Sequence, residues 1–99
     1  MQESEFIKHC ENTLIKLLDQ IEKLDSSMRL DVEYSDGVLS IVDESSGKTY
    51  IINRNAASRK IWYSSPISGA DYFSYDELQD KWFDDKKIEL TQKLFGELF

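Results

Sequence analysis

The stretch spanning residues 50–69 constrains the fold of this chain more than any other, because it reads as two β-strands, a short turn between them, and a polar loop around Pro66. Side chains alternate between the two faces of a strand. In both strands one face carries large apolar residues, whereas the other face carries Asn53 in the first strand and Trp62 in the second. We therefore predict the centre of a sheet that is buried on one face, with Asn53 and Trp62 together on the open face. An exposed tryptophan on a strand is typical of a recognition surface. The alternative is that Trp62 is half-buried against Lys60 and a neighbouring strand.

Amphipathic helices are predicted at both ends of the chain, at residues 5–24 and 86–98, because apolar residues recur there at spacings of three and four. The apolar stripe consists of Phe6, Cys10, Leu14, Leu17, Ile21 and Leu24 in the first helix, and of Ile88, Thr91, Leu94, Phe95 and Leu98 in the second. Asp84 and Asp85 precede the second helix, where negative charge favours a helix start. Each helix offers only one apolar stripe, so both have to cover the same face of the sheet.

Between the helices the pattern predicts strands at residues 30–35, 38–42, 48–53 and 59–65, and two short ones at 72–75 and 82–83. Asp36 and Gly37 supply a two-residue hairpin turn. The expected fold is an α+β two-layer sandwich, in which the N- and C-terminal helices pack on one face of an antiparallel sheet of about five to six strands. A chain of 99 residues with 40% apolar content fits one domain over residues 1–99.

Charge is distributed unevenly along the chain, whose formal net charge is -7. Residues 1–44 contain 11 acids and 4 bases, residues 45–70 contain 4 bases and no acid, and residues 71–99 contain 8 acids and 4 bases. The negative total argues against nucleic-acid binding, which needs Lys and Arg to replace counterions on phosphate. The asymmetry suggests cation binding or steering onto a charged partner, although a solvated acidic surface needs neither.

An acidic ridge is the first candidate site. Four acids of the first helix fall within an arc of roughly 120° at about 100° per residue, and two more project from one side of the following edge strand. The metal-ligand candidates are Asp19, Glu22, Asp25, Asp31 and Glu33, and Glu11 lies on the same helical arc. Hard cations prefer such oxygen ligands, and iron would be held mainly through water and exposed carboxylates. The alternative from the residues alone is a solvated helix face.

Other sites have little support in the sequence. His9 is the only histidine, so a multi-histidine metal site or a Ser-His-Asp arrangement lacks partners, and a surface position is expected for it. Cys10 is also alone, which rules out an intramolecular disulfide, and its place in the helix predicts burial. Trp82 is expected to be a core residue. No catalytic residue is predicted, and an enzyme in the strict sense is disfavoured.

The N-terminus, MQESEF, has no basic segment followed by an apolar one, and no run approaches the roughly 20 apolar residues of a membrane span. These features favour a bacterial cytoplasm. A mitochondrial matrix is expected only if the chain is a processed mature form.

The run I-N-R-x5-K-I-W-Y-S-S-P-x-S-G resembles the frataxin family, because the Asn, the Ile-Trp pair and the Ser-Ser-Pro-x-Ser-Gly loop fall in that family's order. Upstream, S-E-F, D-x-E and D-G-V-L resemble its bacterial, CyaY-type, branch, and downstream Trp82 and the closing helix fall where that branch has them. The resemblance covers almost the whole chain. It implies two helices packed on an antiparallel sheet, as the residues themselves predict.

The resemblance also implies roles for the candidate residues. In frataxins a ridge of acids along the first helix and first strand binds iron weakly and contacts the cysteine desulfurase, and all five metal-ligand candidates sit where that ridge has acids. The matching Asn and Trp contact the iron-sulfur scaffold machinery, so Asn53 and Trp62 are expected to bind a partner. Arg59 is added because the basic surroundings of Trp62 favour an acidic partner, and Glu11 and Glu22 are expected to contact a partner from the acidic ridge. The chain departs from the bacterial ridge at Leu18, Lys23, Ser27 and Arg29, which predicts fewer or weaker metal sites.

These expectations combine into an iron-binding accessory or regulatory protein of iron-sulfur cluster assembly. It would dock on the complex of cysteine desulfurase and scaffold protein and hold Fe2+ or Fe3+ weakly at its surface. One alternative is a metal-independent interaction domain in which the ridge is only a docking charge. Another is iron storage with ferroxidase-like oxidation, which the resemblance also implies. A monomer is expected, since no large apolar patch is evident.

Overall fold

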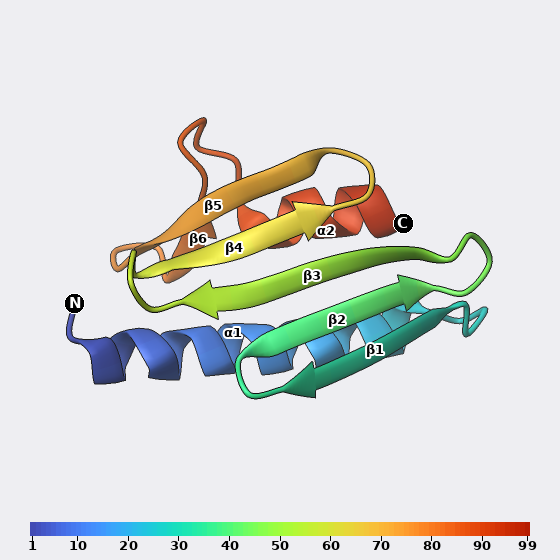
Figure 1. The fold of residues 1–99 in the computed structure, drawn as a ribbon, viewed down its shortest axis with the longest axis horizontal. Helices are drawn as coiled ribbons and strands as arrows, with labels where there is room; N and C mark the ends of the chain where they lie inside the picture. Colours follow the sequence, from blue (N-terminus) through green and yellow to red (C-terminus); the bar gives the residue numbers. More distant parts are fainter.

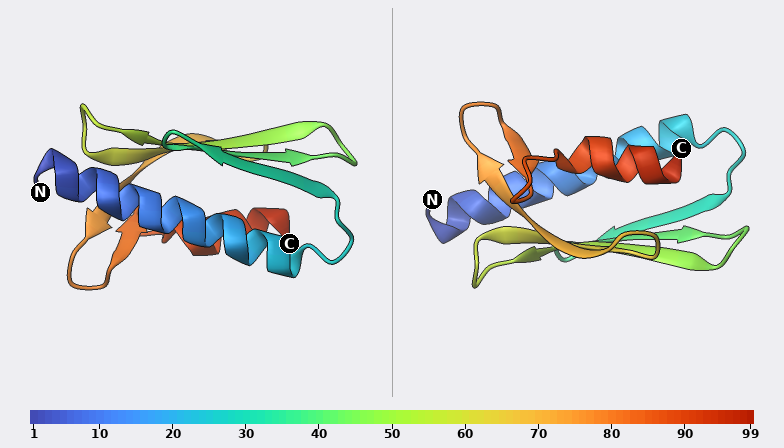
Figure 2. Two further views of the ribbon diagram at one scale, coloured as in Figure 1. Left: turned by 90° about the horizontal axis from the view of Figure 1, so that it is seen from below. Right: turned by 90° about the horizontal axis from the view of Figure 1, so that it is seen from above.

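The structure, a computed structural model, describes all residues from 1 to 99 and has two layers (Figure 1). One layer is a six-stranded antiparallel sheet in which each strand pairs with the next along the chain. The other layer holds the two helices, which lie on the same face of the sheet (Figure 2). The elements are α1 (Glu3–Leu24), β1 (Leu30–Ser35), β2 (Val38–Asp43), β3 (Lys48–Asn55), β4 (Lys60–Ser65), β5 (Gly69–Asp76), β6 (Lys81–Phe83) and α2 (Leu90–Leu98). The predicted α+β sandwich is confirmed.

Helix α1 begins two residues earlier than predicted, at Glu3, and ends at Leu24 as predicted. The buried residues of its stripe are Phe6, Cys10, Leu14, Leu17 and Ile21. Leu24 was expected in this stripe but is 55% exposed. The helix ends at this residue and the chain turns toward β1, so no neighbouring element covers the Leu24 side chain, and Asp25 is buried instead.

Side chains alternate along the strands as the sequence predicts. Those that face the helices are buried and include Leu39, Ile41, Tyr50, Ile52, Ile61, Tyr63 and Phe73. Together with the apolar stripes of the helices they form one core cluster of 16 residues. The opposite face of the sheet carries no helix (Figure 2) and is therefore available to solvent or a partner.

The β1–β2 hairpin turns at Asp36 and Gly37, as predicted. Their φ angles are 48° and 80°, both in the left-handed region that a type I′ turn requires. A Cβ atom on Gly37 would lie 2.7 Å from Nε of Arg54, so another residue there would have to displace the Arg54 side chain, and the positive φ favours glycine in any case. Arg54 also pairs with Asp36 at 3.3 Å.

The strand ends differ from the prediction where local geometry breaks the alternation. Arg59 was placed in the fourth strand, but its φ of 57° puts it in the turn before β4. Strand β5 spans eight residues rather than the four predicted. It begins directly at Gly69, whose φ of 83° ends the polar loop and aligns the chain with β4.

Helix α2 is four residues shorter than predicted, because Glu89 caps it. The Glu89 carboxylate accepts hydrogen bonds from the amides of Thr91 at 2.8 Å and Gln92 at 3.0 Å, which satisfies donors that a helix start leaves unpaired. The buried stripe is therefore Leu90, Leu94 and Leu98. Ile88, expected in the stripe, lies before the helix and is 43% exposed.

The predicted core role of Trp82 is confirmed. Its indole Nε1 donates a hydrogen bond of 2.9 Å to the Thr13 hydroxyl of α1, and its ring meets the Phe6 ring edge-on at 6.0 Å. His9 is half-buried rather than fully on the surface, with its ring stacked on that of Tyr75 at 4.3 Å. Neither helix is long and apolar enough to cross a membrane.

Candidate functional site

A row of side chains crosses the open sheet face at the centre of the molecule. Asn53 of β3 pairs with Trp62 of β4, and Trp62 pairs with Tyr72 of β5. The prediction that Asn53 and Trp62 share this face is confirmed. The Trp62 ring is half-buried because the Tyr72 ring packs edge-on against it at 4.8 Å. Val38, which pairs with Asn53 from β2, is 39% exposed and extends the row.

Tyr72 and Val38 belong to this surface but were not among the predicted site residues. A signal was present for Tyr72, since it alternates with the buried Phe73 and so has to face away from the helices. We define the open-face row as Val38, Asn53, Trp62 and Tyr72.

Arg59 does not join the open-face row. Its guanidinium donates a hydrogen bond to the carbonyl oxygen of Ala56 and lies 4.0 Å from a carboxylate oxygen of Glu3, at the start of α1. The reason is the positive φ that removes Arg59 from strand alternation. The structure therefore places its charge at the helix layer, next to an acid.

The helical acids of the predicted ridge remain free. Glu11, Asp19 and Glu22 are exposed, and their carboxylates make no hydrogen bond or ion pair within the protein. Because their positions are separated by eight and three residues, Glu11, Asp19 and Glu22 lie on one side of α1.

Asp25 has a different environment from these three acids. It is buried, and its two carboxylate oxygens accept hydrogen bonds from the amides of Arg29 at 3.2 Å and Leu30 at 2.9 Å. These bonds hold the turn that connects α1 to β1. Asp25 was predicted as a metal ligand, and in the structure its carboxylate already accepts hydrogen bonds from this turn.

Asp31 and Glu33 are exposed and lie on one side of β1, as expected from their spacing. They alternate with Leu30, Val32 and Tyr34, which pack toward the core, so they point away from the helix layer. Helix α1 and strand β1 lie along the same edge of the molecule, in its two layers (Figure 1). No three of the acids on these two elements bring ligand atoms within 4.8 Å of one another. We use the name acidic ridge below for Glu11, Asp19, Glu22, Asp31 and Glu33.

The four departures from the expected ridge have separate environments. Leu18 packs partly against the core, whereas Lys23 and Ser27 are exposed. Arg29 lies 3.9 Å from Asp25 and 3.7 Å from Asp43, and it donates a hydrogen bond to the carbonyl oxygen of Leu98. Arg29 therefore neutralises acids next to the ridge and joins the loop before β1 to the C-terminus.

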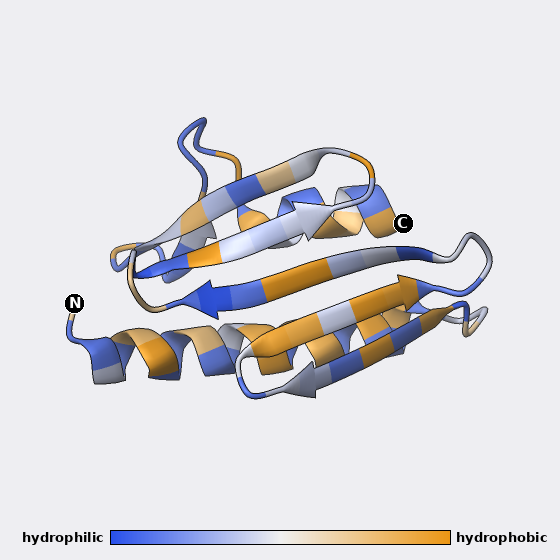
Figure 3. Ribbon diagram, viewed as in Figure 1, coloured by the Kyte–Doolittle hydropathy of each residue, from blue (hydrophilic) through white to orange (hydrophobic).

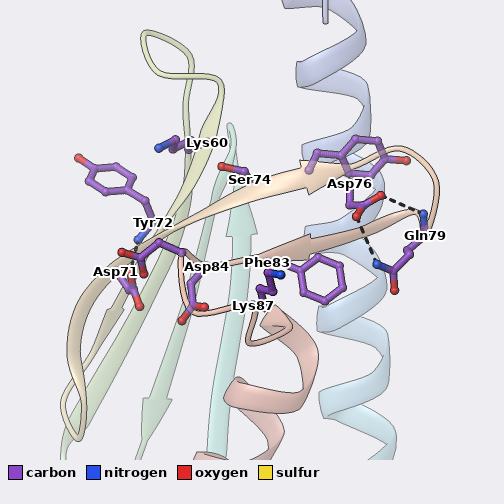
Figure 4. A pocket seen from close by; sticks show the side chains of 11 residues that line it. Lys60, Asp71, Tyr72, Ser74, Asp76, Gln79, Phe83, Asp84 and Lys87 are labelled. Atoms are coloured by element: carbon purple, nitrogen blue, oxygen red, sulfur yellow. Dashed lines mark hydrogen bonds between the residues drawn. The ribbon is translucent and has the colours of Figure 1, made fainter.

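A second group of acids was not predicted. Asp71 of β5 and Asp84 and Asp85, which follow β6, each bring a carboxylate oxygen within 4.8 Å of the other two. They border a pocket of about 670 Å³ that Lys60, Tyr72 and other residues also line (Figure 4). Twelve residues lie between Asp71 and the adjacent pair Asp84 and Asp85, and the pairing of β5 with β6 brings the two parts together.

The comparisons with known proteins agree with this geometry. The model of the frataxin-like domain family matches residues 1–99. The iron-sulfur cluster assembly protein CyaY of Thioalkalivibrio sulfidiphilus is 38% identical over 95 residues, which cover 95% of this chain and 87% of that protein.

Solved structures show the same fold. Frataxin from Psychromonas ingrahamii superposes with a TM-score of 0.86 at 25% identity, covering 100% of this chain and 90% of that one. A trimeric frataxin of Saccharomyces cerevisiae, complexed with ferrous iron, gives a TM-score of 0.75 at 33% identity, covering 91% of this chain and 81% of that one. A two-helix sandwich with a free sheet face and an acidic edge thus defines a protein of the frataxin type. This chain belongs to the frataxin-like domain family.

Proposed function

We propose that this protein is an iron-binding accessory or regulatory protein of iron-sulfur cluster assembly, and that it acts by docking on the complex of cysteine desulfurase and scaffold protein. Its membership of the family supports the assembly role, as does the name of its Thioalkalivibrio relative. The ferrous complex of the yeast relative supports iron as the metal. The bacterial relative also supports a bacterial cytoplasm as the place of action.

The observation that carries the proposal is the unpaired state of the acidic ridge. Its helical carboxylates make no hydrogen bond or ion pair within the protein. They are therefore free to attract a cation or a basic protein surface. No three of the ridge carboxylates converge on one point. Iron would therefore be bound by one or two carboxylates and by water, which gives weak and exchangeable binding rather than a closed metal site.

The open-face row supplies a second contact surface. Trp62 presents a large amphipathic ring beside Tyr72 and the amide of Asn53, and such aromatic groups on a rigid strand are typical anchors of interfaces. Under the proposal, the acidic ridge meets a basic surface of the desulfurase and the open-face row meets the scaffold protein. A monomer is proposed for the free protein, and the yeast relative shows that a frataxin can also form a trimer.

The test is an anaerobic titration of 15N-labelled protein with Fe(II), followed by NMR. We expect amide signals to broaden between residues 11 and 33, at the acidic ridge. Glu22→Lys should weaken this effect several-fold, because it removes one carboxylate and adds a repelling charge. Glu77→Lys is the matched control, since Glu77 is an exposed acid in the β5–β6 turn, away from the ridge. No localised change at millimolar iron would contradict iron binding at the ridge.

A metal-independent docking domain is the second candidate, favoured by the lack of convergence among the ridge carboxylates. The two candidates separate in a pair of binding measurements on Glu22→Lys. If the ridge binds both iron and the desulfurase, the substitution weakens both interactions. If the ridge is only a docking charge, desulfurase binding falls while the wild-type protein shows no localised iron effect.

A further inference from the structure

We propose that Asp71, Asp84 and Asp85 form a binding site for a hard divalent cation such as Ca2+, separate from the acidic ridge. The site lies where β5 passes the loop between β6 and α2, on the side of the molecule that carries the strands farthest from β1. The proposal does not depend on the function proposed above.

The first support is the unpaired oxygen of Asp84. This residue is only 6% exposed, and its Oδ1 accepts hydrogen bonds from the amides of Lys86 at 2.9 Å and Ile88 at 2.8 Å. Its Oδ2 is buried and has no hydrogen-bond partner. A buried carboxylate oxygen without a donor costs free energy unless something positive satisfies it.

The second support is what surrounds this oxygen. Asp71 and Asp85 each place a carboxylate oxygen within 4.8 Å of Asp84 and of each other. Figure 4 shows the carboxyl groups of Asp71 and Asp84 next to each other at the end of the pocket. The Asp84 carboxylate, one oxygen of which is unpaired, therefore belongs to a group of three neighbouring carboxylates. No N–H or O–H donor of the protein reaches the unpaired oxygen.

The orientation of Asp84 is already fixed. Its two hydrogen bonds from the amides of Lys86 and Ile88 hold the carboxylate in place, so a cation would meet a ligand that needs no rearrangement.

The charge at the site suits a divalent ion. Lys93 of α2 lies 3.5 Å from Asp71 Oδ2 and balances one of the three carboxylates. Its ammonium is held over the rings of Tyr63 at 5.3 Å and Phe73 at 5.8 Å, on the core side of Asp71. The other two carboxylates make no ion pair, although Lys60 and Lys87 also line the pocket, and the pocket has room for the waters that complete the coordination of a cation.

All three candidate ligands are carboxylate oxygens, which hard divalent cations such as Ca2+ prefer. Mn2+ has the same preference for carboxylate oxygens and serves as a paramagnetic probe of the site.

The test uses 15N-labelled protein in which Asp19→Asn and Glu22→Gln remove two ridge acids. Mn2+ should broaden the amides of residues 71–72 and 84–86 first, and excess Ca2+ should restore them. Adding Asp85→Asn should weaken both effects about tenfold or more, because it removes one of three ligands. Asp85 is exposed, so this substitution leaves the fold intact. Glu77→Gln, at a nearby exposed acid, is the control and should change nothing.

Asp84→Asn provides an independent reading, because asparagine keeps an oxygen for the two loop amides and replaces the unpaired oxygen with an NH2 group. It should abolish the Mn2+ effect, while amide signals of the core stay in place. Equal broadening at all exposed acids would overturn the proposal, as would a response that Asp85→Asn leaves unchanged. No response at neutral pH would mean that Asp71 and Asp84 share a proton instead, which also overturns it. Iron binding at the ridge is unaffected by either result, since its residues are different.

Discussion

At the scale of single residues, the acids of this protein divide into those that hold the fold and those that are free. Asp25 fixes the turn after α1 with two amide hydrogen bonds. Glu97 of α2 accepts hydrogen bonds from the Tyr63 hydroxyl at 2.8 Å and the Ser65 hydroxyl at 2.6 Å, which joins the second helix to β4. The ridge acids make no such bonds, so their negative charge remains available at the surface.

The lowered pKa of Glu97 should make the free energy of unfolding depend on pH. Burial would raise the pKa of this carboxyl, but hydrogen bonds from Ser65, Ser68 and Tyr63 and the charge of Lys93 hold the pKa below its ordinary value of 4.5. Its contribution is therefore complete above that pH and is lost as the pH falls through the lower folded-state pKa. In Glu97→Gln the acid-induced loss of stability should be smaller, and the free energy of unfolding at pH 7 should fall by about 1 kcal/mol.

Urea unfolding at pH 7 and at pH 3.5 measures both effects. Glu22→Gln is the control, since its carboxylate has no partner. An equal acid-induced loss in the wild type and in Glu97→Gln would show that Glu97 does not contribute.

At the scale of elements, the apolar periodicity predicts both helices and all six strands, because each element buries one face against the core. The ends of elements depend on single contacts that periodicity does not contain, such as the cap at Glu89 and the positive φ of Arg59.

The candidate sites also contain some features that a local sequence pattern predicts and others that depend on contacts between distant residues. Strand alternation places Asn53 and Trp62 correctly, since it is a local property. The burial of Asp25 depends on the turn that follows α1, and the convergence of Asp71 with Asp84 depends on the pairing of β5 and β6. Neither is visible in a pattern of neighbouring residues.

Arg29 connects the loop before β1 to the C-terminal end of α2. It donates a hydrogen bond to Leu98 at the end of α2, and its guanidinium lies 5.5 Å from the centre of the Phe99 ring. Arg29→Ala removes these contacts and also the two ion pairs with Asp25 and Asp43. We expect the free energy of unfolding to fall by about 1–2 kcal/mol.

Amide hydrogen exchange at Leu98 and Phe99 should become faster in Arg29→Ala, because the C-terminus loses its contact with the loop before β1. Lys23→Ala removes an exposed base nearby and should change neither quantity. Unchanged exchange at the C-terminus would contradict the role of Arg29 as a connection between α2 and β1.

At the scale of the whole molecule, charge and apolar surface are separated. Residues 45–70 contain 4 bases and no acid, and they include β3 and β4 in the middle of the sheet. The acids lie in the flanking segments, among them α1, β1 and the loop between β6 and α2, which is hydrophilic over most of its length (Figure 3). A molecule with this distribution presents an acidic edge and, on a different surface, an aromatic contact. The acidic ridge should therefore act mainly through long-range charge, whereas the open-face row should act through direct contact of its aromatic side chains.

This separation predicts different kinetic effects on binding to the desulfurase and scaffold complex. Neutralising the ridge with Asp19→Asn and Glu22→Gln should lower the association rate several-fold and weaken its dependence on salt, because long-range charge acts before contact. Trp62→Ala should leave that salt dependence intact and raise the dissociation rate about 30-fold, which corresponds to about 2 kcal/mol for an aromatic anchor. Surface plasmon resonance at several salt concentrations measures both rates. Thr49→Ala, on the same sheet face, is the control for Trp62→Ala, and urea unfolding shows whether the fold is retained. If Trp62→Ala changed only the association rate, the open-face row would not be an anchor, and docking would rest on the ridge alone.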